Sequence, residues 1–223
     1  MAPEAPVKSS SPERYAVFVA DVVDSRSHGD QAALIGQLTD TLRWVNERTD
    51  PAQPLAMTVG DEFQGAYPAL GAALDAALFT RLRLGGRCDV RFGIGWGEIS
   101  SFDPDRAPMA QSGSAWWAAR EAIDRVAATG SKRQWPRSVR TLVAGVEEPL
   151  AGVLNAFLLC RDALLGKMDD KDLRITLGLF LGERQADIAR ELEITQPSVA
   201  RRQMENGASA VYQAHRAARC LMT

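Results

Sequence analysis

The chain has 223 residues, of which 46% are hydrophobic and 24% charged, and a formal net charge of −2. This is the composition of an ordinary globular protein, large enough for one domain and a smaller appendage, and no segment approaches the roughly 20 apolar residues of a membrane span. The net charge also excludes a polycation that coats nucleic acid. Residues 1–13 are rich in Pro, Ser and Glu and lack the apolar stretch of a secretory signal, so we expect a disordered tail and a cytoplasmic protein.

Cysteine and histidine usage excludes several kinds of site. The 3 cysteines, Cys88, Cys160 and Cys220, are far apart and odd in number, which fits neither a disulfide framework nor a zinc module. With only 2 histidines, His28 and His215, a site that needs several histidine ligands is hard to build. No nucleophile elbow surrounds a serine, which leaves little support for a Ser/His/Asp triad.

The hydrophobic pattern of the first part of the chain predicts alternating strands and helices. A continuous β-branched and aromatic run predicts a buried strand, and leucines at three- and four-residue spacing predict the helix after it. Gly60 and Asp61 tolerate the backbone of a tight turn, so the two short runs beside them predict a hairpin. The predicted strands are Tyr15–Val23, Leu55–Val59, Phe63–Tyr67 and Cys88–Ile99, and the predicted helices lie around Leu34–Val45, Pro68–Leu84 and Gly113–Ala128. This βαββαβ order, with one further helix, predicts an α+β fold whose first domain is ferredoxin-like.

The remainder of the chain has helical spacing. It follows a basic connection at 129–137 and a short predicted strand at Ser138–Ala144. The predicted helices are Pro149–Leu165, Asp170–Leu181, Glu183–Leu192, Gln196–Glu205 and Ala208–Leu221. We therefore divide the chain into a tail (1–13), an α+β domain (14–145) and an all-α domain (146–223).

Two aspartates, Asp21 and Asp61, are predicted to meet at one edge of the sheet. In a βαββαβ fold the end of the first strand and the turn of the hairpin lie at the same edge. Two carboxylates about 4–6 Å apart repel unless a cation neutralises them, and Mg²⁺ prefers one or two carboxylates together with phosphate oxygens. The residues after the strand lead towards a helix start, whose free amides attract anions; they are Val22, Val23, Asp24, Ser25 and Arg26. The alternative is that Asp21 and Asp24 cap the helix and Asp61 only forms the turn.

Residues 15–128 resemble class III nucleotide cyclases in four successive motifs. These are Phe18 to Val22, Val59 to Asp61, Arg91 to Gly95 with Gly97 and Glu98, and Ala118 to Arg120. The resemblance implies a palm-type domain in which Asp21 and Asp61 bind Mg²⁺ or Mn²⁺ and Arg120 stabilises the triphosphate in the transition state. The turn is also similar to that of diguanylate cyclases, in which Glu62 would join the metal site.

The departures from the cyclase pattern concern recognition of the base. Met57 stands where cyclases have a base-reading lysine, Trp116 where they have an asparagine, and the partner aspartate falls near Met109. Apolar groups cannot select the polar edge of a purine. The pattern therefore favours a domain that binds a nucleoside triphosphate, a signalling nucleotide or a related ligand over an efficient cyclase. The candidate ligand-binding residues are Val22, Val23, Asp24, Ser25, Arg26, Met57, Trp116 and Arg120.

Residues 185–202 are typical of a helix-turn-helix and resemble those of bacterial repressors and sigma-like factors. Thr195 and Gln196 cap the second helix. Pro197 fits its first turn, and Val199 packs back on the first helix. Glu193 stands where glycine is usual, and a glutamate fits there if the turn residue need not take positive φ. Outward Gln, Ser and Arg side chains can contact bases or phosphates. The candidate DNA-binding residues are Thr195, Gln196, Ser198, Arg201 and Arg202.

The C-terminal charge is consistent with this prediction, because residues 195–223 hold four arginines and one glutamate. The alternative is a basic solvated face on two helices that only pack or dimerise.

The whole chain is similar to the SatD family of bacterial proteins, and the similarity includes residues 21–26, 60–65 and 118–124. Three functions stay open. The first is a transcription regulator, a homodimer whose cyclase-like domain binds a nucleotide and thereby controls affinity for double-stranded DNA. The second is an active two-metal nucleotidyl cyclase or transferase with Arg120 as the catalytic residue. The third is a protein-interaction scaffold.

Overall fold

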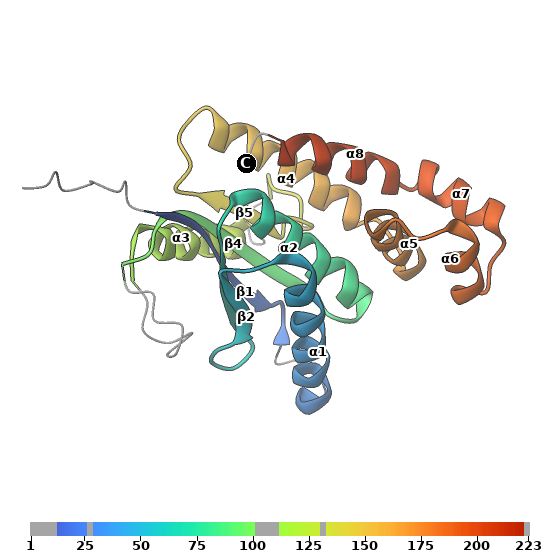
Figure 1. Cartoon of the computed structure of the whole chain (residues 1–223), viewed down its shortest axis with the longest axis horizontal. Coiled ribbons are helices and arrows are strands. Elements are labelled where there is room, and N and C mark those ends of the chain that lie inside the picture. Colours follow the sequence, from blue (N-terminus) through green and yellow to red (C-terminus); the bar gives the residue numbers. More distant parts are fainter. Residues whose placement is uncertain (1–12, 26–28, 101–111, 130–132, 221–223) are drawn as a thin grey trace, which may run out of the picture.

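The computed structural model describes residues 13–25, 29–100, 112–129 and 133–220. In these ranges a five-stranded mixed sheet is flanked by helices, and further helices extend from one end of it (Figure 1). The predicted tail, except for Glu13, lies outside the described residues, as do Arg26 and Met109. No helix in the described ranges combines the length and the apolar character that crossing a bilayer requires.

The sheet has the strand order β2-β3-β1-β4-β5. The central strand β1 (Arg14–Val22) is antiparallel to both β3 (Phe63–Tyr67) and β4 (Val90–Glu98). The edges are β2 (Gln53–Met57), antiparallel to β3, and β5 (Thr141–Ala144), parallel to β4. The predicted βαββαβ order is confirmed, and the strand predicted at 138–144 is found over its last four residues.

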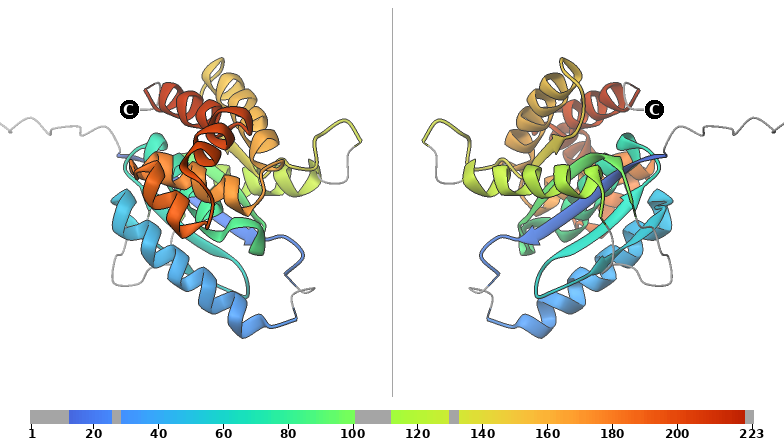
Figure 2. Two further views of the ribbon diagram at one scale, coloured as in Figure 1. Left: turned by 90° about the vertical axis from the view of Figure 1, so that its right-hand side faces the viewer. Right: turned by 90° about the vertical axis from the view of Figure 1, so that its left-hand side faces the viewer.

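Helices cover both faces of the sheet. On one face α1 (Gln31–Thr49) and α2 (Leu70–Leu84) pack against the Ala16, Phe18 and Ala20 side of β1. On the other face α3 (Ser114–Thr129) packs against Val17 and Val19, and it crosses in front of β1 in the right-hand view of Figure 2. A short 3-10 turn, η2 (Gly85–Arg87), connects α2 to β4.

Alternate glycines of β4 allow α3 to lie unusually close to the sheet. A Cβ on Gly95 would lie 2.0 Å from the carbonyl oxygen of Ala115, and one on Gly93 would lie 2.3 Å from that of Ala119. Backbone atoms cannot yield as the end of a flexible side chain can, so any larger residue would push α3 away. The alternation of glycine and large apolar residues in this strand is therefore a requirement of the two-sided packing.

The C-terminal helices are α4 (Leu150–Leu165), α5 (Asp170–Leu181), α6 (Gln185–Glu191), α7 (Gln196–Glu205) and α8 (Ala208–Arg219). Leu154 and Leu158 of α4 belong to the same hydrophobic cluster as β1, and Leu82 of α2 shares a cluster with Leu173 of α5 and Val211 of α8. The boundary predicted after residue 145 coincides with the end of β5, but the hydrophobic core continues across it.

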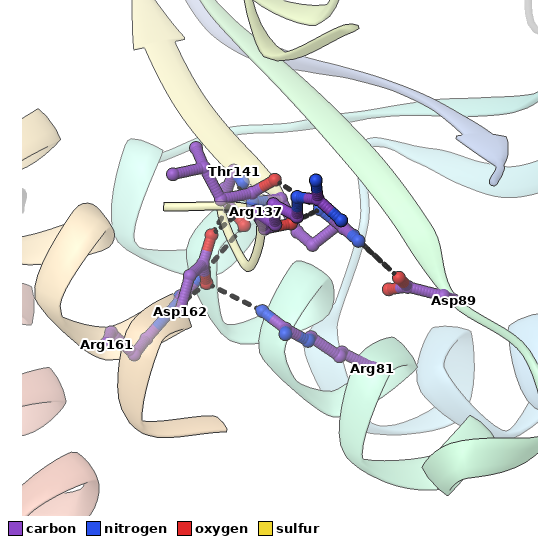
Figure 3. A network of polar contacts seen from close by, with 8 residues as sticks. Arg81, Asp89, Arg137, Thr141, Arg161 and Asp162 are labelled. Carbon is purple, nitrogen blue, oxygen red and sulfur yellow. Dashed lines mark hydrogen bonds and ion pairs between the residues drawn. The ribbon is translucent and has the colours of Figure 1, made fainter. Parts of the chain in front are cut away.

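A buried polar network joins α4 to β5 and α2 (Figure 3). The Asp162 carboxylate is fully buried and accepts hydrogen bonds from the backbone amides of Arg140 (2.8 Å) and Thr141 (2.7 Å). It also accepts from the guanidinium groups of Arg81 (2.9 Å) and Arg161 (3.1 Å). Arg140 in turn forms an ion pair with Asp89 at 2.6 Å. One carboxylate thus fixes the start of β5 and neutralises charge on two helices.

Candidate functional site

Asp21 and Asp61 lie in the same pocket at one edge of the sheet, as the topology predicted. The pocket has a volume of about 510 Å³. It is lined by Asp21, Val22, Asp24, Ser25, Asp61, Glu62 and Arg91. Four carboxylates face one guanidinium in this set, so a polyphosphate would be repelled unless it brought cations with it.

Arg91 is the counter-ion of Asp21, and the sequence reasoning missed it. The two residues are directly opposite each other in β1 and β4, and the guanidinium donates from Nε at 2.8 Å and from Nη2 at 3.0 Å. The argument that the aspartates need an external cation is therefore wrong for Asp21, which already has one. The available signal was Arg91 itself, because a charged residue within a strand of apolar residues and glycine needs a partner.

The carboxylates of the pocket could bind a hard cation such as Mg²⁺ only together with a ligand that supplies further oxygen atoms. Asp21 and Asp61 supply the oxygen donors that Mg²⁺ and Mn²⁺ take. Within the described ranges, however, no three His, Cys, Asp or Glu side chains are grouped so that they could hold an ion. The remaining ligands would have to come from the bound molecule, as phosphate oxygens do in magnesium–nucleotide complexes.

The segment after β1 differs from both interpretations of the sequence. The helix α1 begins at Gln31, and its N-cap is Asp30, whose side chain accepts a hydrogen bond from the Ala33 amide at 2.9 Å. Asp21 and Asp24 therefore do not cap the helix, and the first turn of α1 does not line the pocket. Asp24 instead takes a left-handed conformation, with φ of 52°.

Arg120 reaches the rim of the pocket through Glu62. The hairpin turn is closed by the Thr58 amide, which donates to the Glu62 carbonyl at 2.9 Å. The Arg120 guanidinium extends from α3 and donates to the Glu62 carboxylate at 3.3 and 3.4 Å. Both side chains are well exposed, 48% and 39%, so this ion pair is weak and can exchange for another partner.

The other two predicted ligand contacts lie away from the acidic pocket. Met57 lines a separate, mainly apolar pocket of about 520 Å³ with Leu42 and Leu55. Trp116 lies in the first turn of α3 and packs against the sheet. Its neighbour Ala115 lies beside Gly95 of β4, whereas Arg91 is at the other end of this strand, beyond Gly93. The fold does not bring these two side chains together with Asp21.

The helices α6 and α7 form a compact pair with its own small core. Ile188 and Ala189 of α6 cluster with Val199 of α7 and Ile175 of α5. The Thr195 side chain caps α7 by accepting a hydrogen bond from the Ser198 amide at 3.3 Å, as predicted.

Glu193 was expected to fit the turn only if the turn residue avoids positive φ. This expectation is wrong, because the φ of Glu193 is +54°. Glu193 is exposed and adopts, at some cost in energy, the left-handed conformation for which glycine is usual.

Of the two adjacent arginines of α7, only Arg201 faces solvent. Arg202 donates to Asp169 at 2.9 and 3.1 Å and to Asp172 at 2.5 Å, and these hydrogen bonds raise the pKa of Arg202. The prediction that Arg202 points outward is therefore wrong. Arg201 is exposed and forms no ion pair with the described carboxylates, Gln196 is exposed, and Ser198 is half-buried.

The chain was compared with models of known protein families. The model of the SatD family matches residues 15–222, which is nearly the whole chain. No curated protein matches it. Because the match spans the pocket, the sheet and the C-terminal helices alike, the chain belongs to the SatD family.

Proposed function

We propose that this protein is a DNA-binding transcription regulator in which α6 and α7 form a helix-turn-helix. A cyclase-like palm domain, built on the sheet, would bind a nucleotide-type ligand together with Mg²⁺ or Mn²⁺. The observation that carries the proposal is the α6–α7 pair, with Glu193 left-handed in the turn, Val199 of α7 buried against α6, and Gln196 and Arg201 exposed. A recognition helix needs one side for packing and the other for the major groove.

The exposed side of α7 has suitable chemistry for reading DNA. A glutamine can pair with the edge of adenine and an arginine with guanine or phosphate. Gln196 stands in the first turn of the helix, where recognition helices contact bases. Arg202 would act as a positioning residue, since its ion pairs with Asp169 and Asp172 fix α7 on α5.

The exposed arginine of α7 can be tested against an exposed arginine elsewhere on the surface. Duplex fragments selected from genomic DNA are titrated with the full chain by fluorescence anisotropy at 50 and 200 mM salt. Arg201→Ala should weaken binding by about 5- to 100-fold and reduce the salt dependence, with the free energy of unfolding changed by less than about 0.5 kcal/mol. Arg43→Ala, which removes an exposed arginine of α1, is the control. Equal binding by Arg201→Ala and the unmodified chain would refute the proposed reading helix.

Contacts around the α2–β4 connection support communication between the pocket and the helix-turn-helix. The Val23 amide, beside the pocket, donates to the Asp89 carbonyl at 2.8 Å. The Gly86 amide donates to the Asp170 side chain at 2.7 Å, and Asp170 is the first residue of α5. A ligand that moves the end of β1 would therefore act on a segment that also holds α5, which packs on both α6 and α7.

Ligand binding is tested separately from DNA binding. Nucleoside triphosphates and cyclic nucleotides are screened by thermal shift with and without Mn²⁺. We expect a shift that needs both nucleotide and metal and that is lost in Asp61→Ala, because Asp61 is a proposed metal donor. If the nucleotide shifts the melting temperature equally without metal, the metal-dependent part of the proposal fails.

The alternative function, a nucleotidyl cyclase or transferase, is favoured by one contact, the reach of Arg120 to the pocket rim. Product formation from a triphosphate with Mn²⁺, abolished by Asp21→Ala, would favour it over a regulator that only binds the ligand.

A further inference from the structure

On both edge strands of the sheet, asparagine side chains of the same chain occupy outward-facing backbone hydrogen-bonding groups. At β2, the Asn46 amide donates to the Leu55 carbonyl at 2.9 Å and accepts from the Leu55 amide at 2.8 Å. At β5, Asn155 makes the same pair of bonds with Val143, at 2.9 and 2.8 Å. A strand from another molecule would need these backbone groups, so two copies of the chain are not expected to associate edge to edge.

The outer face of α3 leaves a large aromatic side chain in solvent. Trp117 is 75% exposed, whereas the adjacent Trp116 packs against the sheet. Val59, also 75% exposed, lies in the hairpin turn three residues before Glu62, the ion-pair partner of Arg120. Trp117 and Arg120 are neighbours on the surface of α3, and tryptophan and arginine are the residue types that are enriched in interface hot spots.

Two opposite charges at the middle of this face, Arg120 and Glu121, can pair with a second copy of the same face. Trp117, Arg120, Glu121 and Asp124 share one stripe of the helix, at spacings of three, four and seven residues. In an antiparallel pair of α3 helices with the two-fold axis between Arg120 and Glu121, each arginine faces the glutamate of the second copy. Glu121 is now paired with Arg125 at 3.6 Å, in an exposed contact that is readily exchanged.

We infer that a second copy of this chain docks on the outer face of α3, with Trp117 as the apolar anchor and Arg120 and Glu121 as reciprocal ion pairs. The inference goes beyond the proposed function: it rests on the homodimer expected from the sequence and names its surface. A two-fold interface must be complementary to itself, and a face that carries both signs of charge fits a copy better than a strongly acidic or basic partner. Figure 1 shows α3 at the opposite end of the long axis from α6 and α7, so this contact leaves the proposed recognition helix free.

The test is the oligomeric state of the full chain, measured by sedimentation equilibrium over a range of concentrations. Trp117→Ser should raise the dimer dissociation constant by roughly 10- to 30-fold. Glu121→Arg should raise it by at least about tenfold, because it places like charges opposite each other. Adding Arg120→Glu to Glu121→Arg should restore the dissociation constant to within about threefold of the original value, which a merely structural effect would not do.

Matched controls keep the result interpretable. Asp40 and Arg43 form a comparable exposed pair on α1, and reversing either charge should leave the dimer unchanged. Circular dichroism and melting temperature report whether each variant is folded, and the charge swap stands by itself if Trp117→Ser does not fold. A monomeric unmodified chain, or a dimer insensitive to both Trp117→Ser and Glu121→Arg, would overturn the inference. DNA binding and its weakening in Arg201→Ala would then still stand, so the two proposals fail separately.

Discussion

Replacing Asp162 by asparagine should strongly destabilise the junction between the sheet and the C-terminal helices. The carboxylate is fully buried and is the shared acceptor for two backbone amides at the start of β5, those of Arg140 and Thr141, and for the side chains of Arg81 and Arg161. Asparagine has nearly the same shape, but it carries no charge and replaces one acceptor oxygen by a donor. The substitution therefore removes the interaction without opening a cavity.

The magnitude follows from the burial of the two arginines. The side chains of Arg81 and Arg161 are only 11% and 1% exposed, so water cannot take over the role of the lost carboxylate. Removing one partner of a buried ion pair costs about 3–5 kcal/mol. Since a domain of this kind is stable by only about 5–15 kcal/mol, the loss is a large part of the total.

Urea denaturation followed by circular dichroism measures this effect. Asp162→Asn should lower the transition midpoint with little change in slope, and the difference should persist in high salt because a buried pair is poorly screened. The control is Asp40→Asn, which removes an exposed carboxylate and should change the free energy of unfolding by less than about 0.5 kcal/mol. A loss below about 1 kcal/mol for Asp162→Asn would show that the network is dispensable and would refute this reasoning.

Two further predictions concern backbone strain and pH. Glu193→Gly should raise the free energy of unfolding by about 0.5–1 kcal/mol in urea, because glycine adopts the left-handed turn without steric cost; a marked loss of stability would contradict this. Burial lowers the pKa of His215, and the positive charges of Arg161 and Arg219 lower it further. The hydrogen bond to Asp75 raises it, but by less. The unfolded chain therefore takes up this proton first, and the free energy of unfolding should fall as the pH drops below about 6.5. His215→Gln should flatten that dependence between pH 7 and 5.5, and an unchanged slope would exclude His215 as its cause.

Much of the fold was predictable because its signals are local. Most strands and helices have apolar residues at the spacing of their own element, and glycine or proline residues mark many of the ends. The meeting of Asp21 and Asp61 was also predictable, since it requires only the order of the elements and the direction of the strands. The Thr195 cap follows from four consecutive residues.

What the sequence did not predict depends on partners that are distant along the chain. The Asp21–Arg91 pair joins residues 70 positions apart, and it requires knowledge that β1 and β4 are neighbours in one exact register, since a shift by one residue would turn Arg91 to the other face. Arg201 and Arg202 are indistinguishable in charge and point about 100° apart on the helix. Which of them reaches solvent is decided by Asp169 and Asp172, some thirty residues earlier. Charge composition therefore favoured the prediction that α7 binds DNA, but it could not show that Arg202 is paired with α5 and that Arg201 is exposed.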